Sequence, residues 1–355
     1  MDPVALRVLI SGGGVAGSAL AFWLVRQGHD IPVVEHFTSL RAFGLHIDLR
    51  GPGTEAAPEQ GMQIPDFEFE IMRGNLCRLH YDAANACRTP PKYVFGTSVA
   101  SFEQKDTSVN VRFEDGRTDT FDLLVNADGQ WSRTRRMMLG PGIPDAVQRI
   151  PALYMAYFTV RQPMQKGEKY LTTPEEMQVL LTCNPAPDWL ENVFRGNVEK
   201  DKEAFADIFR GAKWISEDIL KSMWAADDFY CERLGLVKLK SWSSGHVTLV
   251  GEAAHCPTAL SGMALLALLT QTPLPLRSTA TNKPFRPFVK AMQEGIPERA
   301  EKQWNMTGSA FSIGVLNFMV GIASFLKVNI ADLMGIRETV GDGYLPDYES
   351  MVGDK

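Results

Sequence analysis

The chain has 355 residues, of which 45% are hydrophobic and 22% are charged, and its formal net charge is −6 at pH 7. This composition is that of a folded protein, and a chain longer than about 250–300 residues usually divides its core between domains. Lysines and arginines form no block along the sequence, so the chain lacks the clusters of basic residues that are typical of a nucleic-acid-binding protein. Nucleic acid is therefore not expected as a partner.

Cysteine spacing and apolar segments bear on the cellular setting. The five cysteines are odd in number, widely spaced and without a Cys-x-x-Cys pair, which fits neither a disulfide framework nor a zinc site and favours a reducing, cytoplasmic location. The N-terminus has no signal-peptide pattern, because its apolar residues 4–10 run straight into a glycine loop. Residues 310–328 are apolar but interrupted by polar side chains, so a buried helix is favoured over a membrane anchor and membrane contact stays open.

The first 35 residues predict a βαβ unit. Val4–Ser11 is apolar and β-prone, Val15–Gln27 has helical spacing that ends at Gly28, and Ile31–Glu35 is a second apolar strand. A strand, a glycine turn, a helix and a strand in this order imply a parallel sheet with a right-handed crossover.

Hydrophobic patterns predict further elements along the chain. The second half of Phe67–Ala84 looks helical, and a small β-meander with a turn at Asp115-Gly116 leads back to the main sheet. The strands of this meander are predicted at Tyr93–Phe102, Ser108–Phe113 and Thr118–Asn126. A second, sheet-containing layer is predicted from strands at Ala152–Val160, Met177–Thr182 and Trp189–Gly196 and a helical stretch over Lys202–Met223. His246–Val250 is a buried strand that returns to the first domain.

The strongest local signal is the run Gly12-Gly13-Gly14-Val15-Ala16-Gly17. Gly12 permits a tight turn, Gly14 lets the backbone approach a pyrophosphate, and Gly17 lets the helix pack on the strand, while N–H groups at the helix start face the anion. Glu35, followed by His36, closes the second strand 18 residues after Gly17, where a carboxylate can accept hydrogen bonds from ribose hydroxyls. A glycine turn without a ligand is the alternative.

Three downstream segments accompany this loop. They are MRGNL (Met72–Leu76), FDLLVNADGQWSRTRR (Phe121–Arg136) and GHVTLVGEAAHCPTALSGM (Gly245–Met263). In this combination the chain resembles the class A flavoprotein monooxygenases, a group of aromatic hydroxylases, and within it the branch that includes tetracycline-inactivating enzymes. The resemblance runs from Ala5 to about Met263 and continues weakly to LPDY (Leu345–Tyr348).

The resemblance implies a cofactor role for each segment. Asp128 and Gly129 belong to a segment that looks like the DG motif, which approaches the pyrophosphate of FAD. Glu252 stands in a segment similar to the GD motif, whose carboxylate holds the ribityl chain and whose proline and glycine edge the flavin ring. The full set of expected cofactor-binding residues is Gly12, Gly14, Val15, Ala16, Gly17, Glu35, His36, Arg41, Asp48, Arg73, Asp128, Gly129, Glu252, Pro257, Gly262 and Met263.

Plainer alternatives exist for several of these residues. Asp128-Gly129 also fits an ordinary turn at a strand end, and Arg73 fits a surface salt bridge. Arg41 and Asp48 face the flavin by resemblance, but a solvated loop explains them nearly as well. His255-Cys256 is better explained by packing than by metal ligation, and we find no metal-ligand cluster.

The predicted fold is α/β, with a Rossmann-like FAD-binding domain on a parallel sheet, a β-sheet substrate layer and C-terminal helices. The predicted domains are residues 1–149 and 243–300 for FAD binding, 150–242 for the substrate sheet, and 301–355 for a helical segment.

The chain departs from the family pattern in three places. Glu252 stands where the family has aspartate, so its carboxylate lies one methylene farther from the backbone. The chain passes from Met62 to Arg73 almost at once, whereas relatives carry tens more residues there. After Met263, Pro273 and Pro275 break the long helix that relatives place against the flavin.

The leading hypothesis is an FAD-dependent monooxygenase that uses NAD(P)H and molecular oxygen. By resemblance, a C4a-hydroperoxyflavin hydroxylates or epoxidises a hydrophobic aromatic, enol or polycyclic natural product of secondary metabolism. The flavin carries the difficult step, so the sequence need not contain a catalytic nucleophile, and none is assigned. Two alternatives stay open: a non-oxygenating isomerase or cyclase on the same scaffold, and a homologue that does not retain flavin.

Overall fold

The computed structural model describes residues 5–40, 46–49, 69–160, 177–183, 197–212 and 216–256, together with 286–287, 289–290, 293–296 and 298. Several predicted features lie outside these residues. They are Arg41, Pro257, Gly262, Met263, the two prolines after Met263, the strand at Trp189–Gly196 and the C-terminal segment with residues 310–328.

The predicted βαβ unit is confirmed. It consists of β1 (Val8–Ser11), α1 (Val15–Arg26) and β2 (Pro32–Glu35), and β1 pairs in parallel with β2. Every residue of β1 is buried, which fits a central strand that is covered on both faces. Successive side chains of a strand point to opposite faces, so Val8 and Ile10 pack in a cluster with α1 residues while Leu9 packs on the other side.

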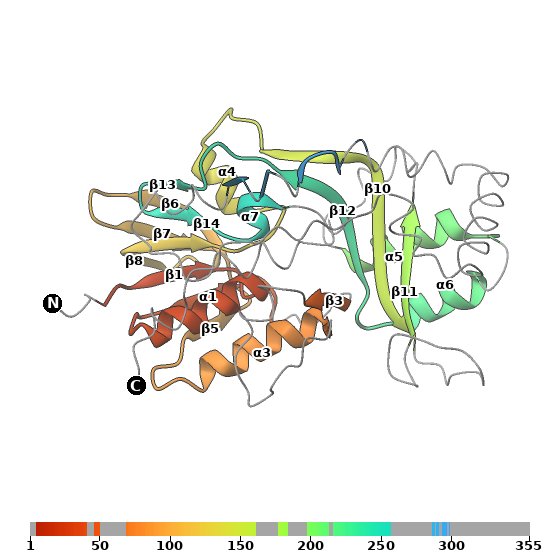
Figure 1. Cartoon of the computed structure of the whole chain (residues 1–355), viewed down its shortest axis with the longest axis horizontal. Helices are drawn as coiled ribbons and strands as arrows, with labels where there is room; N and C mark the ends of the chain where they lie inside the picture. The colour runs from red at the N-terminus through yellow and green to blue at the C-terminus, as the bar shows by residue number, and fades with distance from the viewer. Residues whose placement is uncertain are drawn as a thin grey trace.

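A six-stranded sheet forms the centre of the first unit, in the order β13-β14-β9-β1-β2-β5 (Figure 1). Its remaining strands are β5 (Lys92–Phe95), β9 (Leu123–Asn126), β14 (Val247–Leu249) and β13 (Ser243–Ser244). All neighbouring pairs are parallel except β13 with β14. The return of His246–Val250 to the first sheet is confirmed as β14.

Different elements pack against the two faces of this sheet. Helix α3 (Arg73–Asn85), which confirms the predicted helix, packs beside α1 on one face. On the other face lies a meander of β6 (Val99–Gln104), β7 (Val109–Phe113) and β8 (Thr118–Phe121). The prediction that Tyr93–Phe102 belongs wholly to this meander is wrong, because β5 pairs in parallel with β2 and Gly96, at φ +74°, separates it from β6.

A second, antiparallel sheet has the order β11-β10-β12 and lies beside the first unit in Figure 1. Its strands are β10 (Val147–Val160), β11 (Met177–Cys183) and β12 (Tyr230–Val237). Helices α5 (Val198–Phe209) and α6 (Ser216–Ala225) cover one face, around Phe205 and Met223. The predicted single helical stretch is therefore two helices, and β12 was not predicted because the charged pair in YCERLGLV obscures its alternation.

A short β-ribbon and two short helices accompany the two sheets. A ribbon of β3 (His46–Leu49) and β4 (Phe69–Met72) is antiparallel, and α4 (Arg133–Leu139) and α7 (Glu252–His255) each follow a strand of the main sheet. All five cysteines are thiols that form no disulfide. No helix in the described part of the chain is long and apolar enough to cross a membrane.

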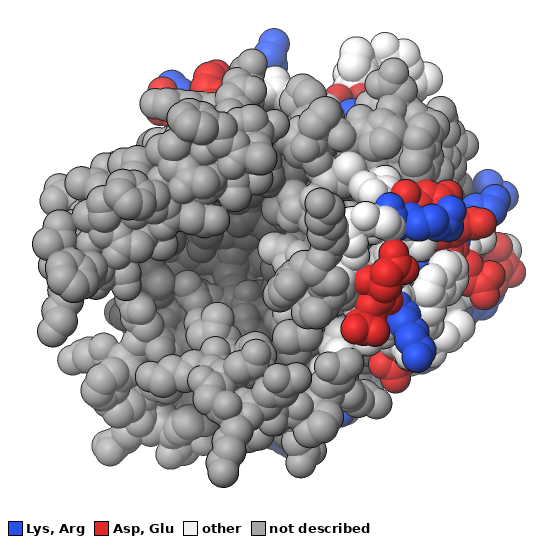
Figure 2. Space-filling model, turned by 90° about the vertical axis from the view of Figure 1, so that its right-hand side faces the viewer, with Lys and Arg blue, Asp and Glu red and all other residues white. Residues whose placement is uncertain are grey.

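Charged side chains are mixed in sign on the side of the molecule where α5 and α6 lie. Figure 2 shows the described lysine and arginine side chains interspersed with aspartate and glutamate. One such pair joins Arg210 Nη2 to Asp207 Oδ1 at 2.7 Å, at the end of α5. Exposed pairs of this kind contribute little to the stability of a fold.

Candidate functional site

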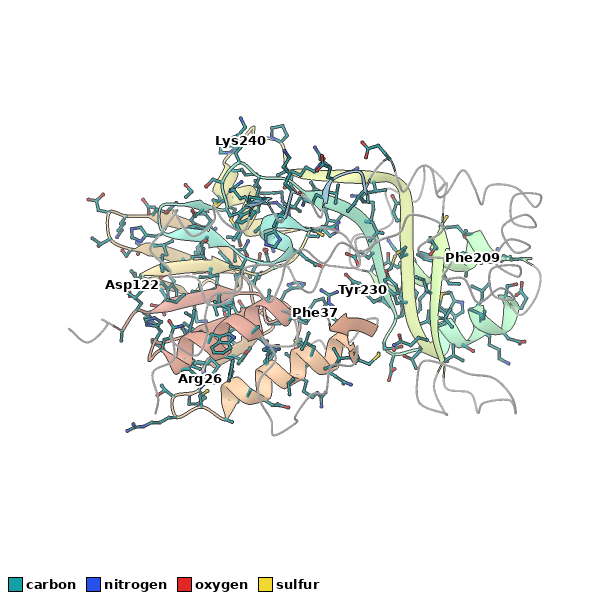
Figure 3. The ribbon with its side chains drawn as sticks, in the orientation of Figure 1. Arg26, Phe37, Asp122, Phe209, Tyr230 and Lys240 are labelled. Carbon is teal, nitrogen blue, oxygen red and sulfur yellow. The ribbon has the colours of Figure 1, made fainter. Side chains whose placement is uncertain are left out.

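A cavity of about 460 Å³ opens at the carboxyl ends of β1 and β9. These neighbouring strands stand at the point where the strand order reverses, since β2 and β5 follow β1 on one side and β9 and β14 lie on the other. Open parallel sheets bind ligands in the crevice at this switch point. Phe37 and Tyr230, both labelled in Figure 3, reach the cavity from the first unit and from the second sheet.

The glycine loop forms one wall, and its three key glycines have different surroundings. A Cβ on Gly12, which has φ +110°, would lie 2.5 Å from the carbonyl oxygen of Ala127, and a Cβ on Gly17 would overlap the carbonyl oxygen of Gly12. A Cβ on Gly14 would meet no atom within 4 Å. Gly12 and Gly17 are therefore required for close packing of β1, β9 and α1, whereas Gly14 faces open space.

Neighbouring side chains hold the loop in place. The Gly13 carbonyl accepts hydrogen bonds from Ser18 Oγ at 3.0 Å and from Cys77 Sγ at 3.5 Å. Burial raises the pKa of Cys77 to about 11, so this thiol stays protonated as a donor at neutral pH. Glu35 Oε2 accepts the Gly13 N–H at 2.7 Å and its Oε1 accepts the Phe37 N–H at 3.0 Å, which places the carboxylate directly beside the loop.

Asp128 lies opposite the glycine loop, at the end of β9. Its Oδ2 accepts the backbone N–H groups of Arg133 at 3.0 Å and Thr134 at 3.4 Å, at the start of α4. Its Oδ1 is buried and has no hydrogen-bond partner among the described residues. Burial raises the pKa of the carboxyl group, although Ser132 and then the N–H groups of Thr134 and Arg133 favour its charged form. Gly129 follows with φ +80°, a backbone conformation that favours glycine, and it also lines the cavity.

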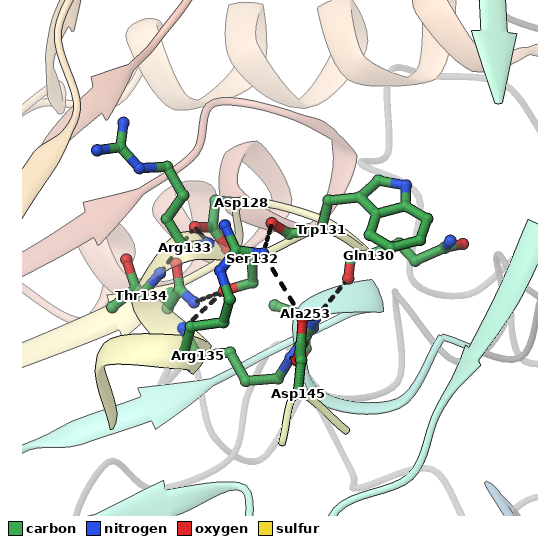
Figure 4. A network of polar contacts seen from close by, with 11 residues as sticks. Asp128, Gln130, Trp131, Ser132, Arg133, Thr134, Arg135, Asp145 and Ala253 are labelled. Carbon is green, nitrogen blue, oxygen red and sulfur yellow. Dashed lines mark hydrogen bonds and ion pairs between the residues drawn. The ribbon is translucent and has the colours of Figure 1, made fainter. Parts of the chain in front are cut away.

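A buried arginine joins the two cofactor segments that the sequence predicts (Figure 4). The Arg135 side chain is fully buried, and its Nη2 and Nη1 donate to the carbonyl oxygens of Gln130 at 2.7 Å and Ala253 at 3.0 Å. Its Nε donates to Asp145 Oδ1 at 2.8 Å. Sequence reasoning missed this role, because nothing in a single sequence distinguishes Arg135 from the half-exposed Arg136 beside it.

Arg73 and Glu252 meet at the cavity from two further helices. Each is the first residue of its helix, α3 or α7, and Arg73 Nη2 lies 3.6 Å from Glu252 Oε2. Burial lowers the pKa of Arg73, but the charge of Glu252, followed by Tyr230 and Glu232, outweighs that effect and leaves the pKa raised. Arg73 therefore stays charged at the wall of the cavity.

The structure brings together most of the predicted residues that it describes. Those that line the cavity are Gly12, Gly14, Val15, Glu35, His36, Arg73, Asp128 and Gly129. Ala16, Gly17 and Glu252 do not line it themselves, but Ala16 follows Val15, Gly17 packs against Gly12, and Glu252 pairs with Arg73. Asp48 pairs with Glu70 in the β3–β4 ribbon, and nothing is described of its side chain. Lining residues that sequence reasoning missed include Phe37, Cys77, Ser98, Val99, Trp131 and Tyr230.

The cavity has the chemical features that a dinucleotide needs. Helix α1 begins without a side-chain cap and without an acidic residue in its first turn, so its first N–H groups are available to an anion. The open space at Gly14 leaves room for a phosphate, and the unpartnered Asp128 Oδ1 calls for a hydroxyl donor. The residues present thus fit a nucleotide cofactor, and this fold and site define a Rossmann-type dinucleotide-binding protein.

Comparison with known proteins narrows this class. No protein-family model matches the chain. The FAD-dependent monooxygenase asL4 of Sarocladium schorii is 34% identical over 428 aligned positions, covering 98% of this chain and 99% of that protein. The flavin-dependent monooxygenase eupH of Phoma sp is 35% identical over 320 positions, covering 73% of each. The crystal structure of tetracycline destructase Tet(51) superposes with a TM-score of 0.68 and 25% identity, over 82% of this chain and 89% of that one.

The relation to asL4 spans nearly the whole of both chains, and the likeness to Tet(51) covers most of each chain. The chain belongs to the FAD-dependent monooxygenases. The predicted α/β fold and the predicted class of enzyme are both confirmed.

Proposed function

We propose that the cavity at the switch point binds FAD and that the enzyme uses NAD(P)H and oxygen to oxygenate a hydrophobic aromatic, enol or polycyclic molecule. The observation that carries this proposal is the convergence of Gly14, Glu35 and Asp128 on one cavity from three separate strand ends. The names of the relatives asL4 and eupH, which are FAD- and flavin-dependent monooxygenases, support it.

Each wall of the cavity has a distinct task in this proposal. The N–H groups of Val15 and Ala16, at the uncapped start of α1, hold the diphosphate. Glu35 exchanges its hydrogen bond with the loop for the ribose hydroxyls of the adenosine. Asp128 Oδ1 accepts a hydroxyl of the cofactor, and Arg73 supplies a fixed positive charge near the phosphates or the flavin.

When bound, FAD supplies the electron transfer and the oxygen activation that side chains cannot perform. The protein orients the cofactor and the substrate, and its apolar side chains exclude water from the site. The second sheet contributes Tyr230 to the cavity, and Tyr230 packs against a buried apolar cluster of Met155, Tyr157, Leu234 and Leu236 on the face opposite to α5 and α6. The rings of Tyr157 and Tyr230 stack with centroids 6.2 Å apart and planes 15° from parallel, and Tyr230 reaches the cavity. This apolar, aromatic surface supports the proposed class of substrate.

The test is a titration of the flavin-free protein with FAD, followed by quenching of flavin fluorescence. Gly14→Val adds a side chain whose Cβ would meet no atom within 4 Å apart from its chain neighbours, so we expect it to fill the phosphate space and leave the fold intact. We expect FAD affinity to fall at least about ten-fold, which is 1.4 kcal/mol, while the midpoint of thermal unfolding stays unchanged.

Gly17→Val is the matched control, because its Cβ overlaps the Gly12 carbonyl and it should lower the unfolding midpoint itself. Unchanged FAD affinity in Gly14→Val would refute this placement of the diphosphate. Oxygen-dependent NADPH oxidation by the FAD-loaded enzyme tests the oxygenase activity, and turnover of substrate without oxygen would favour an isomerase or cyclase instead.

A further inference from the structure

Glu252 does not occupy the position that its place in the motif suggests. It stands where the aromatic hydroxylases carry an aspartate that holds the ribityl chain, yet it is not among the described residues that line the cavity. Its carboxylate is instead directed to Arg73, with Oε2 3.6 Å from Nη2. Only 17% of the Glu252 side chain is exposed, so this ion pair is partly shielded from water and is stronger than a surface pair.

Arg73 needs such a partner because of its place in α3. It is the first residue of a 13-residue helix, where the partial positive charge of the helix end opposes a guanidinium. The first turn of α3 contains no acidic residue, and Met72 at the N-cap makes no side-chain cap. The compensating negative charge therefore comes from outside the helix, and Glu252 is the largest favourable influence on the charged form of Arg73.

The extra methylene of glutamate decides whether the two groups meet. A carbon–carbon bond adds about 1.5 Å of reach, so an aspartate on the same backbone would leave the ions roughly 5 Å apart. That separation exceeds the 4 Å within which a salt bridge forms. Glutamate at position 252 is therefore long enough to form an ion pair between α7 and α3, whereas the aspartate of the family would be too short.

We infer that Glu252 is a positioning residue, which holds the guanidinium of Arg73 against the cofactor cavity instead of binding the ribityl chain itself. This inference rests on the proposed binding of FAD in that cavity. It reverses the expectation for the family residue: restoring aspartate at position 252 weakens cofactor binding in this chain.

The experiment is a double-mutant cycle on FAD affinity, measured by fluorescence titration of flavin-free protein. Glu252→Asp and Glu252→Gln should each weaken FAD binding to a similar extent, about ten-fold, and neither should weaken it further when Arg73 is already Gln. Glu114→Gln is the control, because Glu114 pairs with Arg133, another residue of the cavity wall, at an exposed position. Its FAD affinity should stay within about two-fold of the parent.

A second readout separates positioning from simple support of the fold. At saturating FAD, the visible circular dichroism of the bound flavin should change in the same direction in Glu252→Asp and Arg73→Gln, with unfolding midpoints close to the parent. The inference is overturned if Glu252→Asp binds FAD as tightly as the parent, or if the losses in the double variant multiply.

Failure of the proposed function would look different, since the parent protein would then not bind FAD at all. In that case the ion pair is still tested by the unfolding free energies of four flavin-free proteins: the parent, Glu252→Gln, Arg73→Gln and their double variant. Additive losses of stability in the double variant would show that the pair does not form.

Discussion

Asp201 lies in the first turn of α5, with its side chain buried under the second sheet and its Oδ1 without a hydrogen-bond partner among the described residues. Only 7% of the residue is exposed, and this burial raises the pKa of its carboxyl group from 3.8 to about 6. The neighbouring thiol of Cys231, on β12, has its own pKa raised by burial and then by the charge of Asp201. A buried carboxylate therefore opposes the docking of α5 on the sheet at neutral pH.

The sign of the pH effect follows from the direction of this shift. Because the folded pKa lies above the unfolded value, the stability due to the neutral carboxyl is complete below about pH 4 and is lost as the pH rises through about 6. At 1.36 kcal/mol per pKa unit, the loss of stability is about 1.5 kcal/mol at pH 5 and reaches its full value of about 3 kcal/mol at pH 8. Attraction between the carboxylate and the positive end of α5 offsets about 0.3–1 kcal/mol of this loss of stability.

Asp201→Asn should remove the pH dependence, since the amide has nearly the same shape and no charge. We expect this variant to exceed the parent in unfolding free energy by about 2–3 kcal/mol at pH 8 and by about 1 kcal/mol at pH 5. Urea unfolding of the flavin-free proteins, followed by far-ultraviolet circular dichroism between pH 5 and 8, measures the difference.

Asp218→Asn is the matched control, because Asp218 also lies in the first turn of a helix but is exposed. This substitution should lower stability slightly at both pH values, by about 0.3–1 kcal/mol, through loss of the attraction to the helix end. Equal pH profiles for the parent and Asp201→Asn would refute the argument that burial of this carboxyl costs stability.

Two further predictions follow from the walls of the cavity. Arg135→Met should destabilise the protein by about 3–5 kcal/mol, because it leaves the Gln130 and Ala253 carbonyl groups and Asp145 without their donor. Arg136→Met should change the thermal midpoint little, since that side chain is half exposed. Cys77 should be alkylated by iodoacetamide more slowly than the less buried Cys87, as mass spectrometry of the labelled protein would show, and bound FAD should slow it further. Faster labelling of Cys77 would contradict its burial behind the glycine loop.

Features that depend on neighbours in the chain could be predicted from the sequence. The βαβ unit was predicted from three signals within about 30 residues: the spacing of apolar residues, the spacing of the glycines and Glu35 at the end of the second strand. Each signal reflects the local conformation of the backbone. Gly12 and Gly17 illustrate this, since the close approach of β1, α1 and β9 leaves no room for a Cβ at either position. The return of His246–Val250 to the first sheet was also predictable, because Val247, Leu249 and Val250 mark a buried strand and the segment that resembles the GD motif follows it directly.

Features that join distant segments were decided only by the tertiary structure. The pairing of β5 with β2 and the entry of β12 into the second sheet depend on partners that local alternation does not identify. Arg135 looks like an ordinary charged residue until folding buries it, and nothing in the sequence pairs Arg73 with Glu252 until folding brings α3 and α7 together. A sequence can therefore specify which residues build an anion-binding turn, whereas burial, pKa and the choice of ionic partner arise only when separate strands and helices share one low-dielectric space.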